Sequence, residues 1–93
     1  MRPAVIIQSD TANAVTRYPI TIVAAISTKV KGYPSSVLIV PTQGNGLTAE
    51  SEVLTGQLLT VSKERLHDYI GSLSTDDLKR VNETLAYMLG LTN

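Results

Sequence analysis

The stretch "ITIVAAIS", residues 20–27, predicts the central strand of a β-sheet. Its side chains are almost all apolar, and several are β-branched, which favours an extended chain buried on both faces. Pro19 directly before the run is typical of a turn that leads into a strand. Eight residues are enough to pair with a neighbour on each side, so we expect the rest of the sheet to form around this segment.

Further strand signals flank this segment. Residues 3–9, "PAVIIQS", predict a strand buried on both faces, because the apolar run has no polar alternation. Residues 36–40, "SVLIV", predict another strand. After a glycine-bearing loop, residues 52–61, "EVLTGQLLTV", predict a fourth, in which Gly56 suits a bulge or a close backbone approach. Residues 67–73, "HDYIGSL", predict a short fifth strand.

The C-terminal segment predicts an α-helix. Ser74 can cap its first turn, and the acidic Asp76 and Asp77 favour the positive end of the helix dipole. Asp76 also has the spacing to pair with Arg80, and Gly90 suits the helix end. "SKERL", residues 62–66, predicts a short helical turn. The apolar residues of the long helix fall at helical spacing on one stripe: Leu78, Val81, Leu85, Met88 and Leu89.

Composition limits the possible classes of protein. The chain of 93 residues is 43% hydrophobic and 17% charged, which fits one folded domain over residues 1–93 and argues against disorder. No apolar run approaches the length that spans a bilayer, so we expect no membrane partner and a cytoplasmic location. Without cysteine and with His67 as the one histidine, we expect no disulfide, no metal site and no cofactor. His67 itself fits an exposed surface position.

Charge is balanced over the whole chain but not along it. Eight basic residues match eight acidic ones. In the first third, Asp10 is the one acidic residue, whereas four basic residues lie there: Arg2, Arg17, Lys29 and Lys31. A locally basic segment suits a phosphate-bearing ligand, and an ordinary solvated surface is the alternative.

Five stretches, taken in order, resemble the MazF/PemK family of toxins. They are "RPAVIIQSD", "TIVAAIST", "KGYPSSVLI", "GLTAESEVLTGQLLTVSKERL" and "IGSLSTDDLKRVNETLAYMLGL". The similarity covers essentially the whole chain with compatible spacing. It implies a mainly β domain with a C-terminal α-helix, folded as a small SH3-like β-barrel and assembled as a homodimer. It also implies a bacterial cytoplasmic toxin that is silenced by an acidic, partly disordered antitoxin.

The resemblance implies an endoribonuclease. The family cleaves single-stranded RNA without metal, through attack of the 2′-hydroxyl on the adjacent phosphorus. Arg2 matches the family's catalytic arginine, and its planar fork fits two phosphate oxygens. Ser27 aligns with a hydroxyl residue, threonine in well-studied relatives, which would hold the phosphate or protonate the leaving 5′-oxygen. Without the resemblance, Ser27 is equally typical of a hydroxyl that bonds to backbone at a strand end.

Other positions match family residues that contact RNA. By this resemblance, Ser9, Ser51 and Gln57 are expected to bind RNA. Lys29, which follows Ser27 and Thr28, is a further candidate for contact with the phosphate backbone. Residues of these types are also common at turns, sheet edges and solvated surfaces. Leu59 departs from the arginine that many relatives carry there, which removes an expected basic contact. Tyr33, in the "GYP" turn, is the tyrosine best placed to form a wall of the site, where it would stack on a base.

Two other functions stay open from the sequence. Relatives carry a strand and a loop before the "RP" pair, so the resemblance implies a chain that is truncated at its N-terminus. Such a chain could be an inactive paralogue that dimerises and binds an antitoxin. The same barrel superfamily also contains a toxin that poisons DNA gyrase. Arg2 before Pro3, together with the hydroxyl of Ser27, favours the nuclease.

Overall fold

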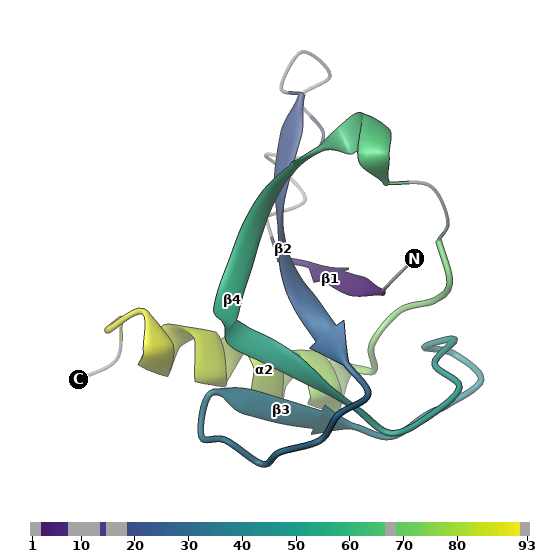
Figure 1. Ribbon diagram of the computed structural model, residues 1–93, viewed down its shortest axis with the longest axis vertical. Helices are drawn as coiled ribbons and strands as arrows, with labels where there is room; N and C mark the ends of the chain where they lie inside the picture. The colour runs from purple at the N-terminus through teal and green to yellow at the C-terminus, as the bar shows by residue number, and fades with distance from the viewer. Residues whose placement is uncertain (1–2, 8–13, 15–18, 67–68, 92–93) are drawn as a thin grey trace.

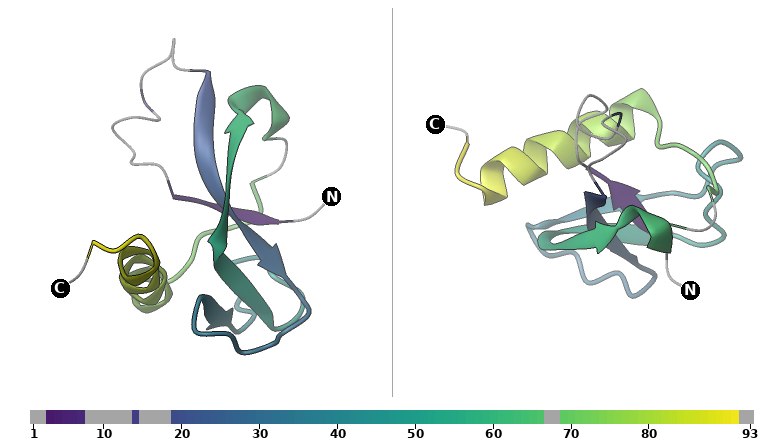
Figure 2. Two further views of the ribbon diagram at one scale, coloured as in Figure 1. Left: turned by 60° about the vertical axis from the view of Figure 1, so that its left-hand side comes forward. Right: turned by 90° about the horizontal axis from the view of Figure 1, so that it is seen from above.

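The computed structural model describes residues 3–7, 14, 19–66 and 69–91. In these residues a curled, four-stranded antiparallel sheet forms a half-barrel with one C-terminal helix (Figures 1 and 2). This confirms the predicted mainly β class. The elements are β1 (Ala4–Ile6), β2 (Ile20–Ser27), β3 (Ser36–Ile39), β4 (Ser51–Ser62), the 3-10 turn η1 (Lys63–Arg65) and α2 (Thr75–Met88). None of the described helices is long and apolar enough to cross a bilayer.

The strand β2 is central, as its composition predicts. The sheet order is β1-β2-β4-β3, so β2 pairs with β1 on one side and with β4 on the other. Every residue of β2 is buried or half-buried. Ala24 and Ile26 belong to the hydrophobic core together with residues from β3, β4 and α2. The β-branched run therefore supplies the apolar wall against which the other elements pack.

A bulge interrupts the pairing between β2 and β4. Ala24 pairs with Leu58, whereas the next residue, Ala25, pairs with Leu54, so residues 55–57 of β4 have no partner on β2. Thr55 bonds to the β2–β3 loop instead. Its backbone N–H and its side-chain hydroxyl both donate to the carbonyl of Ser35, at 3.0 and 2.6 Å. The bulge confirms the interpretation of Gly56 and bends β4.

The helix α2 lies across β3 and β4 (Figure 1). The Ser74 side chain accepts from the Asp77 N–H, as the capping pattern predicts. At the other end, Gly90 has φ +71°, and its N–H donates to Tyr87 O while the Leu91 N–H donates to Ala86 O. This pair of bonds is a Schellman motif, which satisfies carbonyls that the helix end leaves open.

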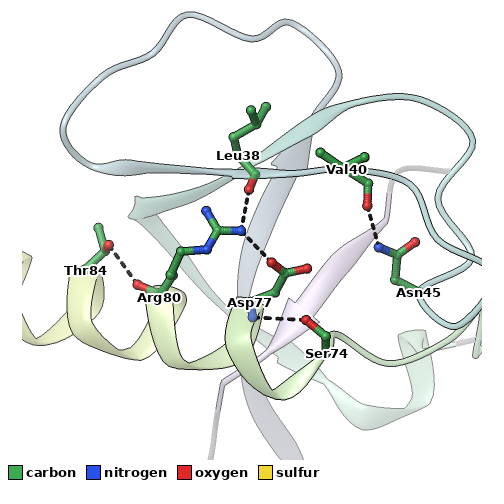
Figure 3. A network of polar contacts seen from close by, with 7 residues as sticks. All are labelled: Leu38, Val40, Asn45, Ser74, Asp77, Arg80 and Thr84. Atoms are coloured by element: carbon green, nitrogen blue, oxygen red, sulfur yellow. Dashed lines mark hydrogen bonds and ion pairs between the residues drawn. The ribbon is translucent and has the colours of Figure 1, made fainter.

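The core side of α2 is narrower than the predicted apolar stripe. Val81 and Leu85 are buried, whereas the remaining members are substantially exposed: Leu78, Met88 and Leu89. The predicted pair of Asp76 with Arg80 is wrong. Arg80 instead forms an ion pair with Asp77 and donates to the carbonyl of Leu38 on β3, at 2.9 Å (Figure 3). The same guanidinium nitrogen makes both contacts, so the i,i+3 pair and the bond to β3 are formed together.

Removing the helix cap is expected to lower stability modestly. In Ser74→Ala, the Asp77 N–H loses its acceptor in the first turn of α2, and we expect unfolding free energy to fall by about 1 kcal/mol. Urea unfolding followed by circular dichroism measures this change. Thr75→Ala, which leaves the capping hydroxyl in place, is the control. Equal stability of Ser74→Ala and the unaltered chain would contradict the role of the cap.

Two strand predictions need correction. The first strand is Ala4–Ile6 and is not buried on both faces, since Ile6 is 49% exposed. Val5 packs against the core, whereas Ala4 and Ile6 lie on the opposite face of the strand and are exposed; residues 8 and 9 lie outside the described part. The predicted fifth strand is absent from the described residues 69–73, which form a connection to α2. This connection makes one backbone bond to residue 44 rather than a ladder.

This connection is packed against the loop that follows β3. Asn45 is buried, and its side chain accepts from the N–H of Thr42 and of Leu47 and donates to Val40 O (Figure 3). The Gly44 carbonyl accepts from the Ser72 N–H at 2.8 Å. Backbone meets backbone directly here, so the contact leaves no room for a side chain at Gly46.

Candidate functional site

A pocket of about 310 Å³ lies where the end of β2, the β2–β3 loop and the bulge of β4 come together. The loop runs along the lower edge of the molecule in Figure 1. The pocket is lined by Ser27, Lys29, Lys31, Tyr33, Ser35, Ser36, Glu52, Leu54, Gly56 and Gln57. Three of these were predicted from the sequence as catalytic or RNA-binding residues: Ser27, Lys29 and Gln57.

Ser27 is the last residue of β2, which places its hydroxyl at the rim of the sheet. The Lys29 N–H donates to Ser27 Oγ at 3.1 Å. This bond is the backbone contact expected of a strand-end hydroxyl, and it uses an acceptor lone pair of Oγ. A hydroxyl that accepts one bond also has a proton to donate, and within the described part of the chain no acceptor for it is recorded.

Two lysines make the pocket basic. Lys29 and Lys31 both belong to the exposed β2–β3 loop. On the opposite side, Gln57 is exposed because the bulge of β4 turns away from β2. Tyr33 is 57% exposed and supplies an aromatic surface. Cations, a hydroxyl, an amide and an aromatic ring together suit a ligand that carries both phosphate and planar bases.

Glu52 forms the buried floor of the pocket. Its residue is 2% exposed, and its two carboxylate oxygens accept from the N–H of Lys31 and of Gly32, each at 2.9 Å. These two bonds are the main cause that lowers the pKa of Glu52 below its usual value, against the opposing effect of burial. The hydroxyl of Ser36 and the charge of Lys31 lower it further. At neutral pH Glu52 is therefore ionised.

The remaining predicted residues fall into two groups. Arg2 and Ser9 lie outside the described residues, as does His67. The neighbour of Arg2 in the sequence, Pro3, is described, and its carbonyl accepts from the N–H of Ile26 at 3.3 Å. Thus the start of the described chain lies beside the residue that precedes Ser27.

Ser51 and Leu59 are placed away from the pocket. Ser51 is 1% exposed, and its hydroxyl donates to Ala49 O at 2.9 Å, so it does not line the pocket. Ser51 begins β4 and pairs with Ile39 of β3. Leu59 is 55% exposed, but it lies beyond the bulge in the second half of β4.

Sequence reasoning missed the buried member of the pocket. Glu52 stands in an apolar context, "SEVL", and a carboxylate there predicts either exposure or an internal partner. The partner is backbone in a loop about twenty positions earlier, which no local pattern reveals. Among the residues that the structure describes, no cluster of His, Cys, Asp and Glu could hold a metal ion.

Fold and pocket together define a small, mainly β protein with a basic, partly aromatic pocket at the edge of a curled sheet. Residues 1–89 match the family of PemK-like, MazF-like toxins of type II toxin–antitoxin systems. The chain belongs to this family. Endoribonuclease MazF9 of Mycobacterium tuberculosis is 35% identical over 94 residues, which cover 97% of this chain and 79% of that protein.

Solved structures of similar proteins confirm the fold. The Mycobacterium tuberculosis toxin MazF-mt6 is 24% identical, with a TM-score of 0.85 over 99% of this chain and 89% of that chain. A mycobacterial endoribonuclease in complex with its cognate antitoxin gives the same identity and TM-score over 99% of this chain and 84% of that chain. A MazE–MazF structure from Deinococcus radiodurans is 23% identical, with a TM-score of 0.79 over 98% of this chain and 87% of that chain.

Proposed function

We propose that this chain is the toxin of a type II toxin–antitoxin system and acts as an endoribonuclease on single-stranded RNA, such as mRNA. The single observation that carries the proposal is the meeting of Ser27, Lys29 and Gln57 in one pocket. These residues come from β2, from a loop and from β4; the resemblance assigns Ser27 to catalysis and Gln57 to RNA binding, and Lys29 is the neighbouring candidate for contact with phosphate. The name of the relative MazF9 supports the activity.

The proposed reaction is metal-independent and uses the RNA's own nucleophile. The 2′-oxygen loses its proton and forms a bond to the adjacent phosphorus, while the bond from phosphorus to the 5′-oxygen breaks. The 5′-oxygen gains a proton, so the products are a cyclic phosphate and a 5′-hydroxyl. The reaction needs stabilisation of charge on the phosphoryl oxygens and two proton transfers.

Each proposed residue has a role in this scheme. Arg2 stabilises the phosphoryl oxygens through its planar fork, which keeps its charge at any physiological pH. The Ser27 hydroxyl, whose oxygen accepts from the Lys29 N–H, donates its proton to a phosphoryl oxygen or to the leaving 5′-oxygen. Lys29 and Gln57 bind the flanking RNA. Ser9 belongs to the proposal on the resemblance alone, and Ser51 is left out because it is buried.

We propose the same partners that the family resemblance implies. The chain would form a homodimer of SH3-like barrels in the bacterial cytoplasm and bind an acidic, partly disordered antitoxin. A similar mycobacterial endoribonuclease was solved in complex with its cognate antitoxin, which supports this partner. The basic pocket suits an acidic segment that competes with RNA.

Loss of the Ser27 hydroxyl is expected to slow cleavage without preventing folding. In excess EDTA, we expect the unaltered chain to cleave a mixed-sequence single-stranded RNA and Ser27→Ala to lower kcat about 100-fold. Ser72→Ala removes an exposed hydroxyl outside the pocket and should cleave like the unaltered chain. The measurement is single-turnover cleavage of a labelled RNA, with product ends identified by mass.

Four results would count against the proposal. Equal rates for Ser27→Ala and the unaltered chain would remove Ser27 from the mechanism. Cleavage that stops in EDTA and returns with a divalent cation would contradict metal independence. An unaltered chain that binds an antitoxin but cleaves no RNA would favour the inactive paralogue, and inhibition of DNA gyrase would favour the gyrase-poisoning toxin.

A further inference from the structure

The β2–β3 loop is exposed, but the backbone of its turn at residues 31–32 bonds to the buried carboxylate of Glu52. Residues 28–34 are all exposed, whereas Glu52 beneath them is 2% exposed. Both carboxylate oxygens are used, one on the Lys31 N–H and the other on the Gly32 N–H. Hydrogen bonds to an ionised group are roughly twice as strong as neutral ones. The turn is therefore attached to β4 at two adjacent backbone atoms.

This attachment is long-range and lies beside the pocket cations. Glu52 belongs to β4 between its two neighbours, pairing with Ser27 of β2 and Leu38 of β3. The backbone that carries the carboxylate is therefore paired on both sides within the sheet. Lys29 and Lys31 are the loop residues whose charges line the pocket. A lysine side chain is flexible, so the position of its backbone decides where its charge can reach.

A buried carboxylate in a pocket for a polyanion needs an explanation. Unpaired, it would repel phosphate and carry a large desolvation cost. Here its charge is turned toward two backbone N–H groups, and an ordered loop is the result. The backbone that carries the two lysines is therefore already ordered before the ligand binds, which lowers the entropy cost of binding.

We propose that Glu52 is a positioning residue, which fixes the turn at residues 31–32 and so sets Lys29 and Lys31 to contact the phosphates of single-stranded RNA. This inference rests on the proposed function. It assigns no chemical step to Glu52, which acts through the loop. Its signature is electrostatic, because a lysine that no longer reaches a phosphate removes one contact from the salt dependence of binding.

The test measures binding of a mixed-sequence 2′-O-methyl RNA, which lacks the nucleophile and stays intact. We expect Glu52→Gln to raise Kd about tenfold at low salt and to lower the slope of log K against log salt by about 0.7 to 1.4, the value for one or two contacts to a single strand. Glutamine keeps the size but can accept only at its one oxygen. Glu50→Gln, the same charge change at an exposed position, is the matched control.

A double-mutant cycle separates positioning from general damage. Lys31→Ala should lower the salt slope in the unaltered chain and change it little in Glu52→Gln, because that lysine is already displaced. In cleavage assays, Glu52→Gln should raise KM and leave kcat within about twofold. If Glu52→Gln only lowered overall stability, the molecules that stay folded would bind RNA with the same salt slope as the unaltered chain.

A second variant keeps the test independent of whether Glu52→Gln folds. Gly32 has φ +71°, and a Cβ there meets no atom within 4 Å, so Gly32→Ala strains the turn without disturbing any packing. It should also lower the salt slope. Unchanged slopes in both variants, or tighter RNA binding by Glu52→Gln, would overturn the inference. No RNA binding by the unaltered chain would overturn the proposed function and this inference with it.

Discussion

Arg2→Ala reduces RNA cleavage at least about 1000-fold, the expected result if this guanidinium stabilises charge on the phosphoryl oxygens. The resemblance assigns Arg2 this role, and its sequence neighbour Pro3 bonds to Ile26, the residue before Ser27. Arg2 is expected to make the largest catalytic contribution, because the remaining groups position the RNA or donate a proton. Single-turnover cleavage in EDTA measures the effect directly.

A second substitution at Arg2 tests whether a positive charge alone is enough for cleavage. Arg2→Lys keeps a positive charge but loses the fork that holds two oxygens at once, so we expect it to recover only a small part of the activity. Arg65→Ala removes an exposed arginine of η1, outside the pocket, and should leave cleavage unchanged. If Arg2→Ala cleaves as fast as the unaltered chain, Arg2 is not the catalytic arginine.

Short-range sequence patterns correctly predicted the central strand and the C-terminal helix. The β-branched run at 20–27 gave a strand with those bounds, and Ser74 capped a helix that begins at Thr75. The segments that failed are those whose state depends on distant partners. Residues 69–73 have strand-like side chains, but they pack against the loop at 44–46, where one backbone bond replaces a ladder. Whether an apolar run finds a strand partner is a tertiary property.

The candidate site likewise contains residues that short motifs predicted and one residue whose role depends on distant partners. The family motif indicated Ser27 and Gln57, and the structure brings them together with Lys29 in one pocket beside the bulge at 55–57. Glu52 was beyond prediction, since its partners are the backbone atoms of Lys31 and Gly32. Backbone donors leave no trace in the sequence.

Gly46→Ala is expected to cause a large loss of stability. Gly46 has φ +69°, and an added Cβ would lie 2.0 Å from the carbonyl oxygen of Ile70 and 2.8 Å from its carbon. The positive φ costs about 1 kcal/mol or more, and forcing two backbone segments apart costs about 1–3 kcal/mol further. We expect unfolding free energy to fall by roughly 2–4 kcal/mol, which is a large part of the total stability of a small domain.

Two other glycines separate the causes of this loss. Gly44→Ala, in the same loop, places its Cβ 3.9 Å from the nearest atom, so its stability should stay within about 0.5 kcal/mol of the unaltered chain. Gly32→Ala has a similar positive φ but open space around its Cβ, and should lose only the conformational part. Urea unfolding of the three variants measures the difference. If Gly46→Ala is no less stable than Gly32→Ala, the loop after β3 moves freely off Ile70, and the close backbone contact does not hold the connection to α2 in place.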